Sequence, residues 1–223
     1  MDEQLLMVLE YLREYRTYFH ICQNYGISES SAYKAVKWVE DTLVKHLNFA
    51  LTGLKAIMKS DMNYEVVLID ATETPIERPK KTKILLFRKE EMAYTKNSNS
   101  VRQANIPSNM YRFSNGKKHD FRLFKESKIL IRLKVEAITD TGYQGIQKIH
   151  NNSELPKKKS KKNTLTKNDK KNNPRLAGER VMNETVIGML KQFKIIADKY
   201  RNRRKRLGLR FNLISGIYNF ELP

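Results

Sequence analysis

The chain has 223 residues, a formal net charge of +19 and 40% hydrophobic residues, which is enough apolar material to fold around a core. The charge favours an anionic partner, nucleic acid above all, and no apolar run approaches the roughly 20 residues that cross a bilayer. The acidic start MDEQLL is unlike a signal peptide, and the single cysteine, Cys22, excludes a disulfide framework and a cysteine-based zinc site. We therefore expect an intracellular protein without a membrane partner.

The first part of the chain predicts three helices. Residues 2–15 place apolar side chains at every third or fourth position, which is typical of a helix with one buried face. A shorter helix is predicted over residues 18–24 and ends before Gly26, and Ser28 then offers an N-cap for a third helix. Helix, glycine turn and capped helix are the parts of a helix-turn-helix, although any αα-hairpin can show them.

The third helix carries short polar and cationic side chains near its N-terminal end, namely Ser30, Ser31, Lys34 and Lys37. These residue types suit base edges and phosphates when a recognition helix enters the major groove of double-stranded DNA. A solvated helix face is the simpler explanation and stays open. We predict DNA contact at these four residues.

Composition changes near residue 60. Residues 1–60 are therefore predicted to form a helical DNA-binding module, and residues 64–223 a second domain of mixed α/β class. Buried strands are predicted over residues 65–70 and within residues 127–140, because aliphatic and β-branched side chains gather there.

The second half of the chain is dominated by basic residues. Residues 153–175 contain eight lysines and almost nothing to bury, which predicts a solvated loop or, alternatively, the lining of a DNA channel. A long amphipathic helix is predicted over residues 176–200. The tract RNRRKR at residues 201–206 precedes a last apolar helix.

Two aspartates end the predicted strands, and one glutamate lies on the long helix. Asp70 and Asp140 could simply cap turns, and Glu184 could pair with Arg180 four residues before it. On a continuous helix, Arg180, Glu184 and Lys191 fall within roughly 40° of each other. A carboxylate between two cations would then lie at the edge of the apolar stripe, where a phosphate backbone could be held.

Several stretches together carry a family resemblance, by their order and spacing: TYFHICQNYGISESSAYKAVKWVED, VLIDATETPIERP, KKHDFRLFKESK, ITDTGYQGI and the segment from NETVIGML to IYNFEL. The chain resembles the DDE transposases of bacterial insertion sequences, in particular their fourth-and-fifth insertion-sequence group. The likeness covers most of the chain except residues 82–113. It implies an N-terminal helix-turn-helix followed by an RNase-H-like catalytic domain.

The resemblance also assigns roles. It implies that Asp70, Asp140 and Glu184 are the catalytic residues and hold two divalent ions, Mg²⁺ or Mn²⁺, and that Arg180 and Lys191 hold DNA. Hard cations prefer carboxylate oxygens, and two of them stabilise both the attacking and the leaving oxygen of a phosphodiester. One auxiliary tyrosine of the family pattern is replaced here by Ala177.

As a transposase, the protein is expected to cut DNA at the ends of its element and transfer the freed strand to target DNA. Joining two ends favours a homodimer, and the expected location is the bacterial cytoplasm at the nucleoid. The alternatives are a non-catalytic, sequence-specific DNA-binding remnant of a transposase and, on charge alone, an RNA-associated protein.

Residues 82–113 depart from the family pattern. They lack period-2 alternation, so the second and third strands of the sheet are predicted to be degraded, the catalytic carboxylates poorly fixed and the activity reduced. Permitted codons for Ile84–Lys89 (ATA CTA TTA TTC CGG AAA), read one base later, begin YYYSGK, which is far more strand-like. We interpret the chain as a truncated, partly frame-shifted member, a hypothesis that sequencing the gene tests.

Four further polar residues were weighed around the first two aspartates. His119 and Asp120 are predicted to start a helix rather than to bind a metal. Glu73 and Glu77 are close to Asp70 in sequence, but we do not expect them to alter the charge of Asp70.

Overall fold

The computed structural model divides the chain into two compact units, which are described separately here. The first unit consists of residues 1–51, 74–87 and 188–221, and the second of the remaining residues. Within them the structure describes residues 2–46, 48–49, 51, 66–77, 87–96, 108–115, 119–127, 131–159, 164–202 and 205–222, with backbone alone for residues 87–96 and 108–115. The predicted module boundary near residue 60 lies outside the described residues.

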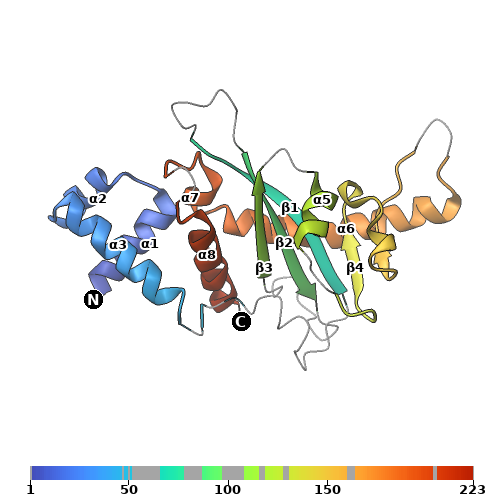
Figure 1. The fold of residues 1–223 in the computed structure, drawn as a ribbon, viewed down its shortest axis with the longest axis horizontal. Coiled ribbons are helices and arrows are strands. Elements are labelled where there is room, and N and C mark those ends of the chain that lie inside the picture. The colour runs from blue at the N-terminus through green and yellow to red at the C-terminus, as the bar shows by residue number, and fades with distance from the viewer. Residues whose placement is uncertain are drawn as a thin grey trace. The chain divides into compact units, whose positions relative to one another are not determined.

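The first unit is helical (Figure 1). Its helices are α1 (Asp2–Glu14), α2 (Tyr18–Tyr25), α3 (Glu29–Leu43), α7 (Lys194–Ala197) and α8 (Leu207–Glu221). The three predicted N-terminal helices are thereby confirmed. Their caps are also as predicted, because the Ser28 hydroxyl accepts a hydrogen bond from the Ser31 amide at 3.1 Å and Gly26 has a left-handed φ of 62°.

The core of this unit joins segments that are far apart in sequence. Helix α1 packs against α3 and α7, and α3 packs against α8. Glu40 of α3 is fully buried and accepts hydrogen bonds from Arg206 and Arg210, each at 2.7 Å. The C-terminal helix therefore completes the core of the N-terminal helices.

The second unit is built on a five-stranded sheet in the order β3-β2-β1-β4-β5. Strands β1, β4 and β5 are parallel to one another, and β2 and β3 form an antiparallel pair. The strands are β1 (Val66–Pro75), β2 (Phe87–Lys96), β3 (Ser108–Asn115), β4 (Glu136–Thr139) and β5 (Ser153–Glu154). The mixed α/β class predicted from the sequence is confirmed.

Strands β2 and β3 correct one prediction. Residues 82–113 were expected to contain degraded strands, but residues 87–96 pair with residues 108–115, from Arg88 opposite Asn115 to Tyr94 opposite Ser108. Hydrogen bonding to a neighbouring strand overrides a weak local pattern, because strand propensity depends strongly on context. The frame-shift hypothesis concerns the gene and stays a prediction.

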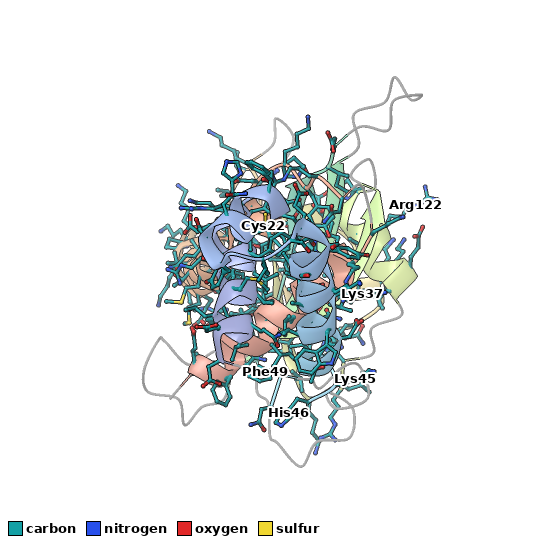
Figure 2. All side chains as sticks on the ribbon, turned by 90° about the vertical axis from the view of Figure 1, so that its left-hand side faces the viewer. Cys22, Lys37, Lys45, His46, Phe49 and Arg122 are labelled. Atoms are coloured by element: carbon teal, nitrogen blue, oxygen red, sulfur yellow. The ribbon has the colours of Figure 1, made fainter. Side chains whose placement is uncertain are left out.

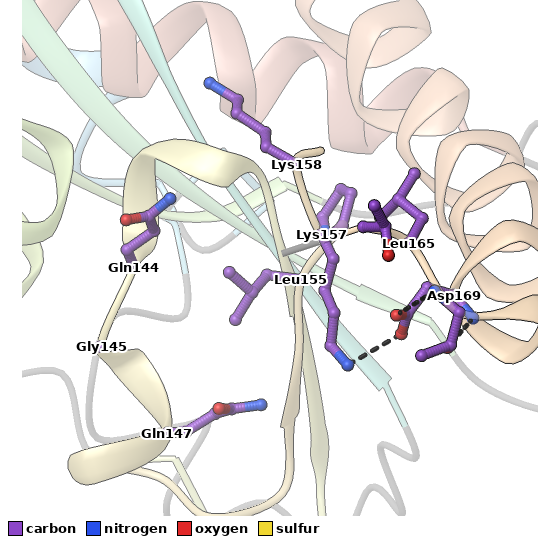
Figure 3. Close-up of a pocket in the computed structure, with 11 residues that line it drawn as sticks. Gln144, Gly145, Gln147, Leu155, Lys157, Lys158, Leu165 and Asp169 are labelled. Carbon is purple, nitrogen blue, oxygen red and sulfur yellow. Dashed lines mark hydrogen bonds and ion pairs between the residues drawn. The ribbon is translucent and has the colours of Figure 1, made fainter. Parts of the chain in front are cut away.

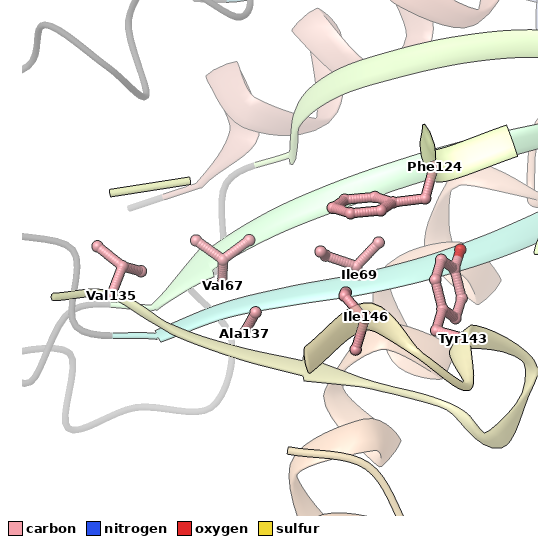
Figure 4. Close-up of a cluster of buried hydrophobic side chains, with 7 residues drawn as sticks. All are labelled: Val67, Ile69, Phe124, Val135, Ala137, Tyr143 and Ile146. Carbon is pink, nitrogen blue, oxygen red and sulfur yellow. The ribbon is translucent and has the colours of Figure 1, made fainter. Parts of the chain in front are cut away.

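One face of the sheet is covered by α5 (Asp120–Ser127) and by two short 3-10 helices, η1 (Thr141–Tyr143) and η2 (Ile146–Lys148), while α6 (Lys167–Leu190) runs behind the sheet (Figure 1). Side chains from β1, from β4 and the residue before it, from α5 and from the two 3-10 helices form one buried cluster (Figure 4): Val67, Ile69, Phe124, Val135, Ala137, Tyr143 and Ile146. The cluster packs the first half of β1 and the start of β4 against α5, η1 and η2.

Helix α6 corrects two further boundaries. It begins at Lys167, inside the region predicted as a loop, because Thr166 and Asp169 cap each other's amides at 3.1 and 3.2 Å. It ends at Leu190 instead of continuing toward residue 200, and α7 follows as a separate helix. No helix in the described part of the chain is long and apolar enough to cross a bilayer.

Candidate functional site

Two aspartates lie side by side on neighbouring strands of the sheet. Strands β1 and β4 pair in parallel from Val66 opposite Glu136 to Ile69 opposite Thr139. The residues that follow this paired stretch are Asp70 and Asp140. Neighbouring strands lie about 4.8 Å apart, so this register places the two aspartates next to each other. Asp140 follows the last residue of β4, but β1 continues past Asp70 to Pro75, so the predicted end of the first strand at Asp70 is wrong.

Each aspartate is held by a backbone amide. Asp70 Oδ1 accepts a hydrogen bond from the Ala71 amide at 2.8 Å, and Asp140 Oδ1 accepts one from the Gly142 amide at 2.8 Å. Asp140 thus caps η1, as its simpler interpretation required. Among the described residues, Oδ2 of each aspartate accepts no hydrogen bond, so one oxygen caps and the other is available for a ligand. The expectation of poorly fixed aspartates is wrong at these two positions.

A third carboxylate, Asp120, lies next to Asp140. A Cβ atom added at Gly142 would lie 2.7 Å from Asp120 Oδ2 and 2.9 Å from Asp140 Oδ1, so both carboxylates crowd the same glycine. Helix α5 begins at Asp120, and the Leu123 amide bonds to the His119 carbonyl, which confirms the predicted helix start. The sequence predicts Asp120 as a helix start rather than a metal ligand, and its position beside Asp140 follows from the packing of α5 against η1, which no local pattern indicates.

The environment of Asp70 penalises its negative charge. Burial is the largest cause that raises the pKa of Asp70 to about 6, and the negative charges of Asp140 and Asp120 act in the same direction, against the lowering effects of the Ala71 amide and of Arg180. Three carboxylates therefore lie close together, and the Arg180 guanidinium offsets only part of their charge. The surplus of negative charge favours binding of a cation.

Arg180 and Glu184 both lie on α6, and they differ in their relation to the aspartates. Arg180 is half-buried and acts electrostatically on Asp70. Glu184 is exposed one turn further along, and no ion pair joins it to Arg180. Among the described residues, no group of three or more His, Cys, Asp or Glu side chains is arranged to hold a metal ion. The structure thus brings Asp70 and Asp140 together without Glu184.

Two other predicted positions have exposed side chains. Lys191 directly follows the last residue of α6, where the Gln192 amide bonds to the Met189 carbonyl, and its role in holding DNA stays a prediction. Glu73 is exposed and, by strand alternation, lies on the face of β1 opposite to Asp70.

The donor chemistry of these aspartates fits a divalent cation in part. Asp70 and Asp140 offer hard oxygens from adjacent strands, each fixed by its backbone amide. Their mutual repulsion would be relieved by a positive ion. Asp120 lies next to Asp140, but within the described part of the chain no three carboxylates form a group arranged to hold a metal.

A polar hollow of about 680 Å³ lies in the same unit, beyond η1 (Figure 3). Gln144, Gly145 and Gln147 line one side, and residues 155–158 and 164–166 line the other together with Asp169. Lys157 and Asp169 form an ion pair at 2.8 Å across its floor. Amide and ammonium groups in such a hollow suit a polar, anionic ligand such as a nucleotide of a DNA strand.

On the first unit, the predicted recognition face is exposed. Ser30, Ser31, Lys34 and Lys37 all have exposed side chains, and Figure 2 shows Lys37 on the surface of α3. Ser31 and Lys34 line a shallow hollow with Trp38, whose side chain is 51% exposed. A helix that presents polar, cationic and aromatic side chains to solvent can contact base edges and phosphates.

Comparison with known proteins gives two family matches and one relative. Residues 1–49 match the model described as helix-turn-helix of DDE superfamily endonuclease, and residues 69–219 match the model described as DDE superfamily endonuclease. The chain is similar to the probable transposase for insertion sequence element IS702 of Microchaete diplosiphon, with 42% identity over 222 residues, which cover 99% of this chain and 80% of that protein. No solved structure matches the chain.

Proposed function

Because the chain belongs to the DDE superfamily endonucleases and, within them, to the transposases of insertion sequences, we propose that it cuts DNA at the ends of its element and transfers the freed strand to target DNA. The observation that supports the proposal is the placement of Asp70 and Asp140 side by side on the neighbouring strands β1 and β4, each held through one oxygen by a backbone amide. Such an enzyme would work on chromosomal DNA in the bacterial cytoplasm at the nucleoid, as a homodimer when it joins two element ends.

The proposed roles of the residues follow from their chemistry. Asp70 and Asp140 would hold divalent ions, Mg²⁺ or Mn²⁺, with Glu184 as the third carboxylate. Bound ions of this kind stabilise the charge on the attacking and leaving oxygens of a phosphodiester. Arg180, beside Asp70, would hold a DNA phosphate, and Lys191 is proposed to hold another. No covalent bond between protein and DNA is required.

A second candidate function is a DNA-binding remnant that does not cut. The absence of Glu184 from a metal-binding group with the two aspartates, among the described residues, favours it. In that case the exposed side chains Ser30, Ser31, Lys34 and Lys37 would bind element ends without cleavage.

A nicking assay on supercoiled plasmid separates the two functions. The transposase is expected to convert the plasmid to its open-circular form with Mg²⁺ or Mn²⁺ and to stop when the ions are chelated. The remnant is expected to bind the plasmid and lower its mobility in a gel, and this binding should weaken strongly as the salt concentration rises. It should leave the plasmid supercoiled with or without Mg²⁺ or Mn²⁺. Reaction products are resolved by agarose electrophoresis after removal of the protein.

Gly142→Ala tests whether the crowded turn at η1 matters for cleavage. The new methyl group would lie 2.7 Å from Asp120 Oδ2 and 2.9 Å from Asp140 Oδ1, so the carboxylates must shift. We expect a loss of about 10²-fold in nicking rate, because misplacement of catalytic groups by about 1 Å costs this much. Rates are measured under single-turnover conditions.

Gly178→Ala is the matched control for this variant. Its added Cβ meets no atom within 4 Å, and alanine favours the helix by about 1 kcal/mol. It should cut at the rate of the unmodified chain. Equal rates for the two alanine variants would remove Asp140 and Asp120 from the cleavage site.

A further inference from the structure

The first compact unit contains a strongly basic cavity of about 690 Å³. One wall is formed by the helix-turn-helix, through Tyr18, Tyr33 and Lys37. The other is formed by residues near the C-terminal end of the chain: Arg201, Asn202, Lys205, Arg206 and Arg210. These walls come from opposite ends of the sequence and are joined by the bonds of Glu40 to Arg206 and Arg210.

The charges around the cavity do not cancel. Five cationic side chains line it, Lys37, Arg201, Lys205, Arg206 and Arg210, and two carboxylates, Glu40 and Asp41, pair with them. Both carboxylates are bound by Arg206 or Arg210. The balance of five positive charges against two negative charges leaves the cavity positive.

The described partners of Arg201 are neutral groups. Its Nη2 donates to the backbone carbonyls of Tyr15 and Arg16, and its guanidinium stacks 4.0 Å from the centre of the Tyr15 ring. The Asp41 carboxylate is bonded by Arg206, and no salt bridge joins Lys37 or Lys205 to a carboxylate among the described residues. The ammonium groups of Lys37 and Lys205 can therefore meet an anion, and the Arg201 guanidinium carries further N–H donors besides the two bonds that Nη2 makes.

The backbone around Lys205 is fixed in place. The Lys205 amide donates to the Asn202 carbonyl at 3.0 Å, and its own carbonyl accepts a hydrogen bond from the Tyr200 hydroxyl at 2.6 Å. The next residue, Arg206, has a φ of 62°, which is strained for a side chain other than glycine and is held by the two ion pairs to α3. A strained turn held by buried charges positions Lys205 beside the cavity.

The exposed surface of α3 carries two stripes. Ser31 and Lys34 lie in the hollow with Trp38, whereas Tyr33 and Lys37 line the basic cavity. When a recognition helix lies in the major groove, the phosphate backbone passes along its side. The first stripe suits base edges, and the second faces the position of a flanking phosphate.

We propose that this cavity binds a backbone phosphate of DNA, gripped by Lys37 from the helix-turn-helix and by Arg201 and Lys205 from the C-terminal segment. The DNA-reading surface is then composite, and its phosphate clamp is supplied by residues beyond the helix-turn-helix. This inference rests on the proposed function, since it names how the same protein holds DNA.

The test uses the full chain and a fluorescent duplex of arbitrary sequence, because a phosphate contact does not depend on sequence. Lys205→Ala and Lys37→Ala are each expected to weaken binding by roughly three- to tenfold and to reduce the slope of log affinity against log salt by about 1. Lys205→Arg should retain binding. Lys199→Ala, an exposed lysine of the same unit outside the cavity, is the matched control and should change neither quantity. Melting curves confirm that all variants fold alike.

The outcomes separate this inference from the function on which it rests. If Lys34→Ala weakens binding and Lys205→Ala behaves like Lys199→Ala, the clamp is wrong and DNA binding by α3 stands. If the unmodified chain does not bind DNA at all, both fail. A second arm adds inorganic phosphate at constant ionic strength. In one outcome, phosphate raises the melting temperature of the unmodified chain but not that of Lys205→Ala, while both proteins bind DNA with equal affinity. This result would identify a site for free phosphate and would overturn the DNA assignment.

Discussion

Replacing Asp70 or Asp140 by asparagine is expected to lower the nicking rate by about 10³-fold or more and to leave DNA affinity nearly unchanged. Each aspartate offers one oxygen beyond the one that accepts a backbone amide. An amide in its place provides no negative charge for a divalent ion, and such ions contribute several kcal/mol of transition-state stabilisation. Nicking rates and fluorescence anisotropy on the same preparations check both parts.

Asp70→Asn should also change stability in a pH-dependent way. The pKa of Asp70 is raised from 3.8 to about 6, so the folded chain binds this proton more tightly than the unfolded chain. Stability contributed by the protonated form is full below about pH 4 and is lost as the pH rises toward 6. Above pH 6 the asparagine variant is expected to be more stable by about 2 to 3 kcal/mol, and below pH 4 the two should be equal.

Asp169→Asn supplies a control of opposite sign. The Lys157 ammonium, together with the capping bonds of Thr166, lowers the pKa of Asp169 to about 2. Its ionised form therefore stabilises the fold above about pH 4, and that contribution is lost as the pH falls toward 2. Melting temperatures measured from about pH 2 to neutral pH should show Asp169→Asn destabilised and Asp70→Asn stabilised at neutral pH, each relative to the unmodified chain.

Adding divalent ions shows whether Asp70 and Asp140 bind a metal or affect stability only through the packing of the core. If the two aspartates hold a divalent ion, Mg²⁺ or Mn²⁺ should raise the melting temperature of the unmodified chain and leave both asparagine variants unchanged. An equal response in all three proteins would place the metal elsewhere and count against the proposed site.

The site was predictable to the extent that it depends on neighbours in sequence or on strand register. Asp70 and Asp140 each follow a run of aliphatic residues, and parallel pairing of the two runs brings the aspartates together. Ser28 and Gly26 indicated the helix-turn-helix through their capping chemistry. In each case the deciding interactions span a few residues or one pair of strands.

The remaining features depend on contacts that no local pattern encodes. Strands β2 and β3 form by pairing across the sheet despite a poor alternation of residues. Helix α6 starts at the reciprocal cap between Thr166 and Asp169, whose residue types and spacing are visible in the sequence but stand in a lysine-rich stretch that is typical of a loop. Asp120 reaches the site because α5 docks on η1, and nothing near residue 120 indicates that docking.

Glu40→Ala is expected to destabilise the first compact unit by about 3 to 5 kcal/mol. Glu40 is fully buried, and Arg210 is 2% exposed. Removing the carboxylate therefore leaves a buried guanidinium without its counter-ion. Burial lowers the pKa of Arg210, but the charge of Glu40 more than offsets this, and the guanidinium stays ionised. The Tyr200 hydroxyl, at 2.9 Å, cannot replace that charge. Denaturant unfolding measures the loss.

Two companion variants show whether the buried charge is responsible. Asp41→Asn removes an ion pair in which the carboxylate side chain is 40% exposed, and such pairs contribute less than about 1 kcal/mol. The double variant Glu40→Leu with Arg210→Met removes both buried charges and should recover most of the stability lost in Glu40→Ala, because an apolar pair of similar volume avoids the desolvation cost. A double variant as unstable as Glu40→Ala would mean that packing around α8, and not the isolated guanidinium, determines the loss.

Because the same bonds hold the C-terminal wall of the basic cavity against α3, Glu40→Ala should weaken DNA binding even at temperatures where the chain stays folded.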